Sequence, residues 1–451
     1  MNIPSSNQSF VPSLACRVAE RACVDRTSLR VVDISESLAL RSSAAPMSRR
    51  EMAVLRRLRS RRVTVHRRPS TMSSLARRVA VVARVHRQRV AARRSSARAN
   101  ATSATKSSEN EVILVTGATG RVGKEVIARL RAIPGFTVRA ATRDKDAYAK
   151  ALGAHETTRF DLEDEKTWGP AMEGATRLFS STQDKYIERH MAFAKWCGRT
   201  PEVRNNLKHI VRISCFGADT NTNAYDANAH VSRDNAGIPL MLQHYWWSEE
   251  CFIDSGFKDR LTSIRGNFYM NHLLKNELES IKSKGTFTSP LGECKNSFVS
   301  CNDMAEAAVR CLVEGPERHG DKYYDICGAQ STSMHEVANI LTKALATDEA
   351  KDVCPEAYGK RITYVPQDIE QFEKDFGSTR AEFFEYLRNG FYSRCSPDFY
   401  NITGKRPLTY YEYLTTKGAA GDTGLAELFS SQGAIFTKGV DQFKDLKNIT
   451  K

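Results

Sequence analysis

Residues 115–123 read Val-Thr-Gly-Ala-Thr-Gly-Arg-Val-Gly and hold three glycines at intervals of three residues. The preceding segment, residues 111–116 (EVILVT), is apolar and rich in β-branched residues, so it predicts a buried strand. The following segment, residues 121–133, carries apolar side chains at helical spacing. A glycine triplet between a strand and a helix is typical of a dinucleotide-binding turn. The alternative is a glycine-rich connection that holds no ligand.

Each glycine of this turn has its own expected role. Gly117 permits a tight turn, Gly120 lets the backbone approach a pyrophosphate, and Gly123 allows the helix to pack on the sheet. The first turn of the helix offers backbone N–H groups and the positive end of its dipole to the phosphates. The candidate cofactor-binding residues of this segment are Gly117, Thr119, Gly120, Arg121, Val122 and Gly123.

The end of the second expected strand, residues 136–142, indicates which dinucleotide binds. A carboxylate at this point usually receives the ribose 2′-hydroxyl of NAD, whereas an arginine suits the 2′-phosphate of NADP. Arg143 follows the strand, and Lys145 or Arg121 could assist it. We therefore favour NADP(H) over NAD(H), although the neighbouring Asp144 keeps NAD(H) as the alternative.

Strands and helices continue to alternate along the chain. A third strand is expected to end in residues 159–162 (RFDL), where Asp161 and Leu162 would reach the adenine. A fourth strand, residues 177–181, places Ser181 under the cofactor. Fifth and sixth strands are expected at residues 207–214 and 261–264. Repeated β–α units predict an α/β fold with a doubly wound parallel sheet and ligands at the carboxyl ends of its strands.

The N-terminal region differs in charge from the rest. Residues 1–110 carry 23 basic and 6 acidic residues, whereas residues 111–451 carry 44 and 46. The folded part is thus nearly neutral, which argues against nucleic-acid binding despite the overall charge of +15. From Met52 to Ser108 there is no acidic residue, and Arg, Ser, Ala and Val dominate. That composition is typical of an organelle transit peptide, for a plastid (chloroplast) rather than a mitochondrion; the alternative is a basic arm that binds nucleic acid or membrane.

The eleven cysteines are scattered and form no C-x-x-C motif or zinc-ligand spacing. We expect reduced, mostly buried thiols and no metal site. No apolar run reaches the roughly 20 residues that cross a bilayer, so no transmembrane segment is expected.

Longer segments resemble one family. They are HIVRISCFGAD (209–219), SEECFIDSGFKDRLTSIRGNFYMNHLL (248–274) and SFVSCNDMAEAAVRCLVEG (297–315). With the glycine turn, they resemble the NmrA-like group of atypical short-chain dehydrogenases/reductases over about residues 111–415. This group contains NAD(P)H-dependent quinone reductases, plant phenylpropanoid reductases and non-catalytic redox sensors. The resemblance implies a Rossmann domain, a smaller C-terminal α/β lobe and a substrate cleft between them.

We therefore expect three parts in the chain. Residues 1–108 would be a transit peptide or disordered extension, and residues 109–265 an NAD(P)-binding Rossmann domain. Residues 266–451 would form the smaller substrate-binding lobe and the tail, with the two lobes interleaved. Within this last part, Asp303 is expected to cap a helix N-terminus. Helical spacing predicts a helical lid or packing lobe around Phe372, Phe376, Phe383, Phe384 and Leu387.

The resemblance leaves catalysis less defined. The wider superfamily uses a Tyr-x-x-x-Lys pair, in which the tyrosine passes a proton to the carbonyl. The lysine position falls near Tyr245, where HYWWSEE holds no lysine. The pair Tyr413 and Lys417 is interpreted as chance, far from the expected cleft. His244 or Tyr245 would then donate or orient a proton, and Ser214 matches the serine position of the superfamily.

These residues also have structural interpretations. His244 could be a buried helical histidine, and Ser214 could simply end its strand. The substrate-cleft candidates are Trp246, Phe268 and Tyr269, although Phe268 and Tyr269 suit a hydrophobic core equally well.

Two functions remain in competition. The first is an organellar NADPH-dependent reductase that moves a hydride to a small quinone-like or carbonyl acceptor. The second is a non-catalytic NADP(H)-binding redox sensor or assembly protein, with a protein partner or a homodimer as its context.

Overall fold

The computed structural model describes residues 111–218 and 238–430, all within one compact unit, Thr105–Lys451. The extension expected over residues 1–108 lies outside these described residues. Within the two described ranges, no helix combines the length and the apolar character needed to cross a membrane.

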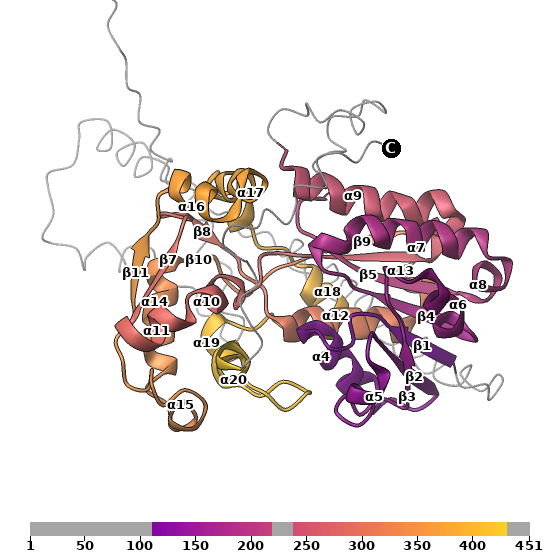
Figure 1. Ribbon diagram of the computed structural model, residues 1–451, viewed down its shortest axis with the longest axis horizontal. Helices are drawn as coiled ribbons and strands as arrows, with labels where there is room; N and C mark the ends of the chain where they lie inside the picture. The colour runs from indigo at the N-terminus through magenta and orange to yellow at the C-terminus, as the bar shows by residue number, and fades with distance from the viewer. Residues whose placement is uncertain (1–110, 219–237, 431–451) are drawn as a thin grey trace, which may run out of the picture. The chain divides into compact units, whose positions relative to one another are not determined.

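Seven strands form one sheet in the order β3-β2-β1-β4-β5-β6-β9, and every neighbouring pair is parallel (Figure 1). The strand order reverses direction between β1 and β4, so the predicted doubly wound α/β fold is confirmed. The strands are β1 (Glu111–Val115), β2 (Phe136–Thr142), β3 (Glu156–Arg159), β4 (Ala175–Ser180), β5 (His209–Cys215), β6 (Leu261–Gly266) and β9 (Lys322–Ile326).

Helices cover both faces of the sheet, because alternate strand side chains point to opposite sides. Ile113 and Val115 of β1 pack with α4, α12 and α18, whereas Leu114 packs with α6, α7 and α9 (Figure 1). These helices are α4 (Arg121–Leu130), α12 (Cys301–Glu314), α18 (Asp398–Thr403), α6 (Trp168–Met172), α7 (Ile187–Arg199) and α9 (Leu240–Phe252). Shorter connecting helices are α5 (Lys145–Tyr148), α8 (Pro201–Asn206) and α13 (Pro316–His319).

A second hydrophobic core holds the C-terminal lobe together. It surrounds a parallel pair, β7 (Thr286–Ser289) with β11 (Thr363–Pro366), and an antiparallel pair, β8 (Lys295–Asn296) with β10 (Thr332–Ser333). Its helices are α10 (His272–Asn276), α11 (Leu278–Lys284), α14 (Met334–Ala344), α15 (Asp348–Val353), α16 (Ile369–Phe376), α17 (Ser378–Arg388), α19 (Tyr410–Thr415) and α20 (Gly424–Phe429). The five side chains expected to form a lid or packing lobe, at 372, 376, 383, 384 and 387, are all buried here.

Several element boundaries differ from the sequence predictions. The helix expected to reach residue 133 ends at Leu130. The third strand ends at Arg159 rather than at residue 162, because Asp161 enters a turn in which Thr167 bonds its backbone. Asp303 is not the helix cap: the hydroxyl of Ser300 caps α12 by accepting from the Asp303 N–H.

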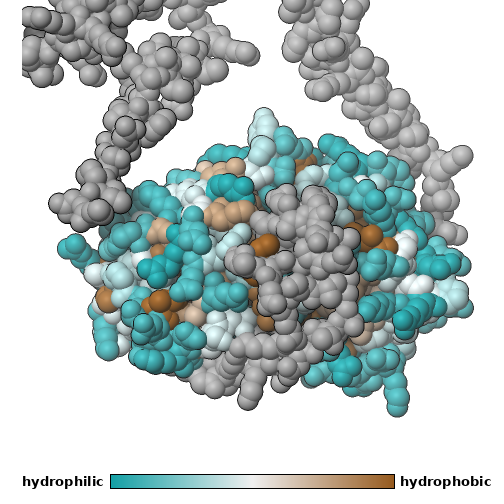
Figure 2. Space-filling model, turned by 90° about the horizontal axis from the view of Figure 1, so that it is seen from above, coloured by the Kyte–Doolittle hydropathy of each residue, from teal (hydrophilic) through white to brown (hydrophobic). Residues whose placement is uncertain are grey.

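On the part of the face in Figure 2 that grey residues leave visible, hydrophilic side chains dominate and hydrophobic residues form small groups. The exposed large hydrophobic residues of the described ranges lie on separate elements; they are Tyr148, Tyr358, Val365, Tyr400 and Tyr411.

Candidate functional site

A cavity of about 590 Å³ lies at the carboxyl ends of β1, β4, β5 and β6. The glycine turn after β1, residues 181–185 after β4 and residues 266–269 at and after the end of β6 form one side of its lining. Helices α9, α10, α12, α17 and α20 contribute further lining residues. Doubly wound sheets bind their ligands at this edge, beside the switch point between β1 and β4.

The glycine turn is a cradle that side chains would fill. Gly117 has a φ of +63°, and Gly120 donates its N–H to the Gly117 carbonyl over 2.9 Å. A Cβ on Gly123 would lie 2.2 Å from that same carbonyl oxygen, closer than any real contact. Gly120 is the N-cap of α4 and makes no side-chain cap, so the first N–H groups of α4 face the cavity edge. These features fit a dinucleotide phosphate.

Thr116 ties this turn to the next strand. Its hydroxyl donates to the Phe179 carbonyl over 3.1 Å and accepts from the Ser181 N–H over 3.0 Å. Ser181 therefore lies directly beside Gly117, and both line the cavity. The contact holds the end of β4 against the glycine turn.

The candidate cofactor residues divide into two groups. Those that line the cavity are Gly117, Gly120, Arg121, Val122, Gly123 and Ser181. The structure does not bring Thr119, Arg143, Asp161 or Leu162 into this lining. Arg143 is exposed at the end of β2, where its Nη1 donates to the Tyr186 hydroxyl over 3.4 Å. Asp161 uses a carboxylate oxygen to accept the Glu163 N–H over 3.1 Å.

The catalytic candidates divide in the same way. Ser214 and Tyr245 line the cavity, whereas His244 does not. His244 is 1% exposed and its ring meets Trp247 edge-on at 5.1 Å, because it points to the buried side of α9. Trp246 is also buried, in a small cluster with Ala218, and stays outside the lining. Of the three substrate-cleft candidates, the structure brings Phe268 and Tyr269 into the cavity.

An acidic residue meets the hydroxyl of Tyr245. Asp184 follows β4, and its carboxylate accepts the hydrogen bond of the Tyr245 phenol. Burial raises the pKa of Asp184 above its usual value, while the Tyr245 bond and the charge of Arg380 partly oppose this. Burial and the Asp184 charge raise the pKa of Tyr245 well above its usual value. The phenol is thus protonated at neutral pH.

Aromatic side chains form one wall of the cavity. The Phe268 ring lies 6.2 Å from that of Phe383 at an interplanar angle of 29°, and Phe384 meets it edge-on at 5.7 Å. His272 contacts both Phe268 and Tyr269. Burial and nearby Arg charges hold the pKa of His272 well below its usual value, so its imidazole is neutral.

Helix α20 contributes to the cavity lining beside the glycine turn. Glu427 of α20 pairs with Arg121 over 3.1 Å and also accepts from the Tyr413 hydroxyl. Lys275 donates to the carbonyls of Glu427, Leu428 and Ser430 over 2.7–3.1 Å. Burial lowers the pKa of this lysine to about 8. Tyr413 was expected far from the cleft, yet it contacts a residue of the cavity wall.

A buried ion pair holds α9 against the sheet. Arg265 of β6 donates to both carboxylate oxygens of Glu249, over 3.1 and 2.6 Å. A second buried arginine, Arg212 of β5, donates to the Ser248 hydroxyl, and its guanidinium lies 5.8 Å from the Tyr245 ring. Bidentate pairs of this kind fix orientation. Both arginines thus hold the helix that carries Tyr245.

Sequence reasoning missed several residues of the lining. They are Asp184, His272, Lys275, Arg380 and Glu427. Asp184 could have been found, because it lies four residues beyond the end of β4, at the edge where ligands bind. The other four lie in the C-terminal lobe; His272 falls within the family-like segment 248–274 but was not singled out, and Lys275, Arg380 and Glu427 belong to no quoted motif. In the described ranges, no group of three or more His, Cys, Asp or Glu side chains could hold a metal ion.

Comparison with known proteins places these features in context. Residues 109–211 match the NmrA-like family. The chain is 27% identical over 320 residues to an NAD(P)H azoreductase of Xenophilus azovorans, which covers 68% of this chain and 99% of that protein. It is 26% identical to quinone oxidoreductase 2 of Escherichia coli, over 56% of this chain and 77% of that protein.

Solved structures share the fold. The NADPH complex of an NADPH-dependent quinone oxidoreductase from Escherichia coli superposes with a TM-score of 0.51 and 21% identity. It covers 67% of this chain and 97% of that one. The Citrobacter sp. triphenylmethane reductase complexed with NADP(H) superposes with a TM-score of 0.50 and 19% identity. It covers 67% of this chain and 98% of that one. At these identities the likeness concerns the fold.

Proposed function

We propose that this chain, which belongs to the NmrA-like family of NAD(P)-binding Rossmann-fold proteins, is an NADPH-dependent oxidoreductase acting on a small carbonyl or quinone-like acceptor. The observation that carries the proposal is a glycine cradle that opens into the same cavity as an aromatic wall and a tyrosine–carboxylate pair. Related proteins named as an azoreductase and a quinone oxidoreductase support an oxidoreductase role.

Bound NADPH would supply a hydride, and the chain's own residues supply position and shelter. The N–H groups at the start of α4 and Ser181 would hold the phosphates and the ribose at the cavity edge. Phe268, Phe383 and Phe384 would hold a flat acceptor and keep water away from it. The acceptor end of the cavity is then the region around Ser214 and Tyr245, beyond β5.

Purified protein should oxidise NADPH in the presence of a quinone panel, followed at 340 nm in the steady state. Titration with NADPH and NADH measures the cofactor preference in the same preparation. NADPH binding without turnover on any quinone, aldehyde or ketone would contradict the proposal.

The second candidate is a nucleotide sensor without turnover. Its support is that HYWWSEE offers no lysine at the position expected for the superfamily pair, and that Asp184 engages the Tyr245 phenol. A relative named prestalk A differentiation protein A, from Dictyostelium discoideum, is 24% identical over 90% of its own length. Native pull-downs with and without NADPH test this candidate, and identical partner sets would remove it.

We also propose an organellar site of action, in a plastid rather than a mitochondrion. The support is the segment from Met52 to Ser108, which is rich in Arg, Ser and Ala and lacks acidic residues. Mass spectrometry of the native protein should find a mature N-terminus near the end of that segment. A mature protein that begins near residue 10 would contradict the transit peptide.

A further inference from the structure

We propose that Asp184 and Tyr245 form a two-residue proton relay, in which the carboxyl group of Asp184 replaces the proton that the Tyr245 hydroxyl gives to the reduced acceptor. This inference rests on the proposed function, because it assigns the proton source for the same cavity. It gives the tyrosine a partner from the β4–α7 loop in place of the lysine that the superfamily uses.

The geometry places the pair at the acceptor end of the cavity. Both residues line it, and the phenol oxygen and the carboxylate share a hydrogen bond. They lie on the β4 and β5 side of the switch point, opposite the half of the sheet formed by β1 and β2. In doubly wound folds the two halves of a dinucleotide bind on the two sides of this point, so the pair faces the nicotinamide half.

The surroundings of Asp184 suit a carboxyl group that is neutral before the reaction and ionised after it. Burial favours the neutral form, whereas Arg380 on α17 supplies a positive charge that stabilises the carboxylate. Cys215 and Tyr269 also face the site, and burial keeps both neutral at physiological pH. Two further cations lie near the pair: the Arg212 guanidinium lies over the Tyr245 ring, and Lys185 lines the same cavity next to Asp184.

The proton balance of the relay closes without tyrosinate. When Asp184 is protonated, its O–H donates to the Tyr245 oxygen, which leaves the phenol hydrogen free to point at an acceptor oxygen. The phenol O–H bond breaks as a new O–H bond forms on the acceptor. The proton of the Asp184 carboxyl group then moves to the phenol oxygen. Asp184 is left as a carboxylate beside Arg380 and regains a proton from water in the cavity. The electron pair that reduces the acceptor is that of the hydride, which NADPH supplies in the proposed function.

The deciding variant is Asp184→Asn, because asparagine can still accept the Tyr245 hydrogen bond but cannot release a proton. If the pair were purely structural, this substitution would keep the hydrogen bond and leave kcat unchanged. We expect Asp184→Asn and Tyr245→Phe each to lower kcat by roughly 100-fold, the scale of general acid catalysis, with the Kd for NADPH unchanged. In the wild type, kcat should fall as pH rises through the pKa of Asp184, and this fall should vanish in Asp184→Asn.

A second measurement does not depend on turnover. The infrared carboxyl band of Asp184 in the protein alone should titrate above the usual aspartate range and should be missing in Asp184→Asn. In Tyr245→Phe its midpoint should move higher, because the phenol bond that stabilises the carboxylate is lost. The exposed positions give matched controls, Asp254→Asn and Tyr400→Phe, which should leave kcat and the pH profile unchanged.

The outcomes separate the relay from the function beneath it. An active wild type with an equally active Asp184→Asn, or with an unchanged pH profile in that variant, overturns the relay alone. A wild type that binds NADPH but reduces no acceptor overturns the proposed function, and the relay with it.

Discussion

Single residues decide whether the nucleotide cradle exists. Gly123 faces the Gly117 carbonyl so closely that a methyl group cannot be placed between them. Both partners are backbone, so neither can swing aside as a flexible side chain would. The glycines are therefore a steric requirement here, and their substitution should affect the turn before it affects anything else.

We predict that Gly123→Ala destabilises the fold by roughly 1–3 kcal/mol, the usual cost of forcing atoms into a packed site, and raises the Kd for NADPH. Urea unfolding and calorimetric titration measure the two effects. Gly169→Ala is the matched control, because a Cβ at this exposed helical position meets nothing within 4 Å. It should leave NADPH binding unchanged, because Gly169 lies outside the cavity lining. Equal behaviour of the two variants would contradict the steric argument.

The positive charge of Arg143 is the basis of a prediction about cofactor preference. It is exposed at the end of β2, held only by a long bond to the Tyr186 hydroxyl among the contacts seen, and stands outside the cavity lining. If it receives the 2′-phosphate, Arg143→Gln should raise the Kd for NADPH roughly 10-fold or more, the worth of a charged hydrogen bond, and leave NADH unchanged. Fluorescence titration with both nucleotides measures this. The exposed Arg318→Gln serves as control.

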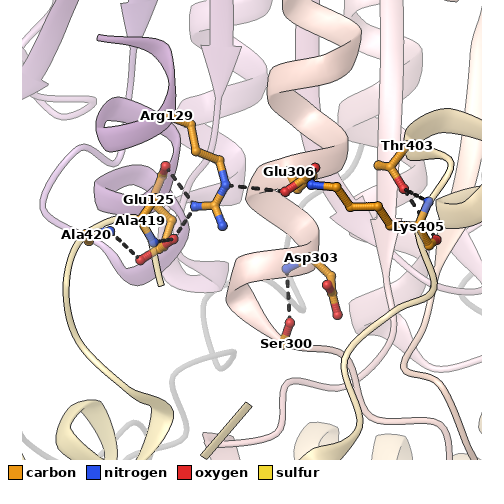
Figure 3. A network of polar contacts seen from close by, with 9 residues as sticks. All are labelled: Glu125, Arg129, Ser300, Asp303, Glu306, Thr403, Lys405, Ala419 and Ala420. Carbon is orange, nitrogen blue, oxygen red and sulfur yellow. Dashed lines mark hydrogen bonds and ion pairs between the residues drawn. The ribbon is translucent and has the colours of Figure 1, made fainter. Parts of the chain in front are cut away.

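At the scale of elements, helix α4 connects the glycine turn to the loop between α19 and α20. Glu125 of α4 accepts the N–H groups of Ala419 and Ala420, each over 2.9 Å, and pairs with Arg129 on the next turn (Figure 3). Arg129 in turn approaches Glu306 of α12, which also binds Lys405 (Figure 3). The helix that presents the phosphate site is thus held by the C-terminal segment.

We predict that Glu125→Ala lowers the free energy of unfolding by about 1–3 kcal/mol, because it leaves the two backbone donors without their acceptor. Urea denaturation measures the loss, and the exposed Glu356→Ala should show almost none. The variant should also weaken NADPH binding, since α4 is freed to shift. A stable Glu125→Ala protein with native affinity would show that this contact does not hold the helix.

Asp303, in the first turn of α12, makes stability depend on pH. Burial raises its pKa to about 6, although it accepts the Leu408 N–H over 2.9 Å. Because the folded pKa exceeds the unfolded one, the neutral group stabilises the fold at low pH, and this is lost as pH rises through about 6. Asp303→Asn should therefore gain up to about 3 kcal/mol over wild type between about pH 4 and pH 7, measured by urea unfolding. A difference that does not vary with pH would contradict the assignment.

Much of the fold was predictable because its signals are local. Residues 136–142 were predicted as a strand and are one, since β-branched and small residues suit a buried parallel strand. The order of the helices and strands and the glycine turn followed from the same periodicity. Helix ends were harder to predict from the sequence. The cap of α12 depends on the single hydroxyl of Ser300, and Asp303, three residues later, offered an equally plausible cap.

The site was only half predictable, because its two sides come from distant segments. The strand ends that meet at one edge of the sheet were foreseen, as Ser181 and Ser214 illustrate. The residues that α17 and α20 add, such as Arg380 and Glu427, depend on how the second lobe packs. The sequence also did not show which side chains of α9 point toward the cavity. His244 and Tyr245 are neighbours, yet only Tyr245 reaches the cavity.

At the scale of the whole molecule, every described residue of the cavity lining belongs to the unit Thr105–Lys451. A chain that begins at Thr105 should therefore bind NADPH with the affinity of the full chain, and its thermal unfolding should be shifted equally by the nucleotide. Calorimetric titration of both forms checks this. A weaker affinity of the shorter chain would assign a binding role to the first hundred residues.

The contact between Glu125 and Ala419 has a consequence for the order of events during synthesis. The glycine turn leaves the ribosome early, but the backbone groups that its helix requires are made 294 residues later. At roughly 5–20 residues per second, translation leaves α4 waiting on the order of 15–60 s for them. For that interval the Glu125 carboxylate lacks the two backbone N–H donors whose hydrogen bonds it accepts in the folded protein. The glycine turn is therefore synthesised early, whereas the contacts that hold its helix form only after residues 419 and 420 have been added.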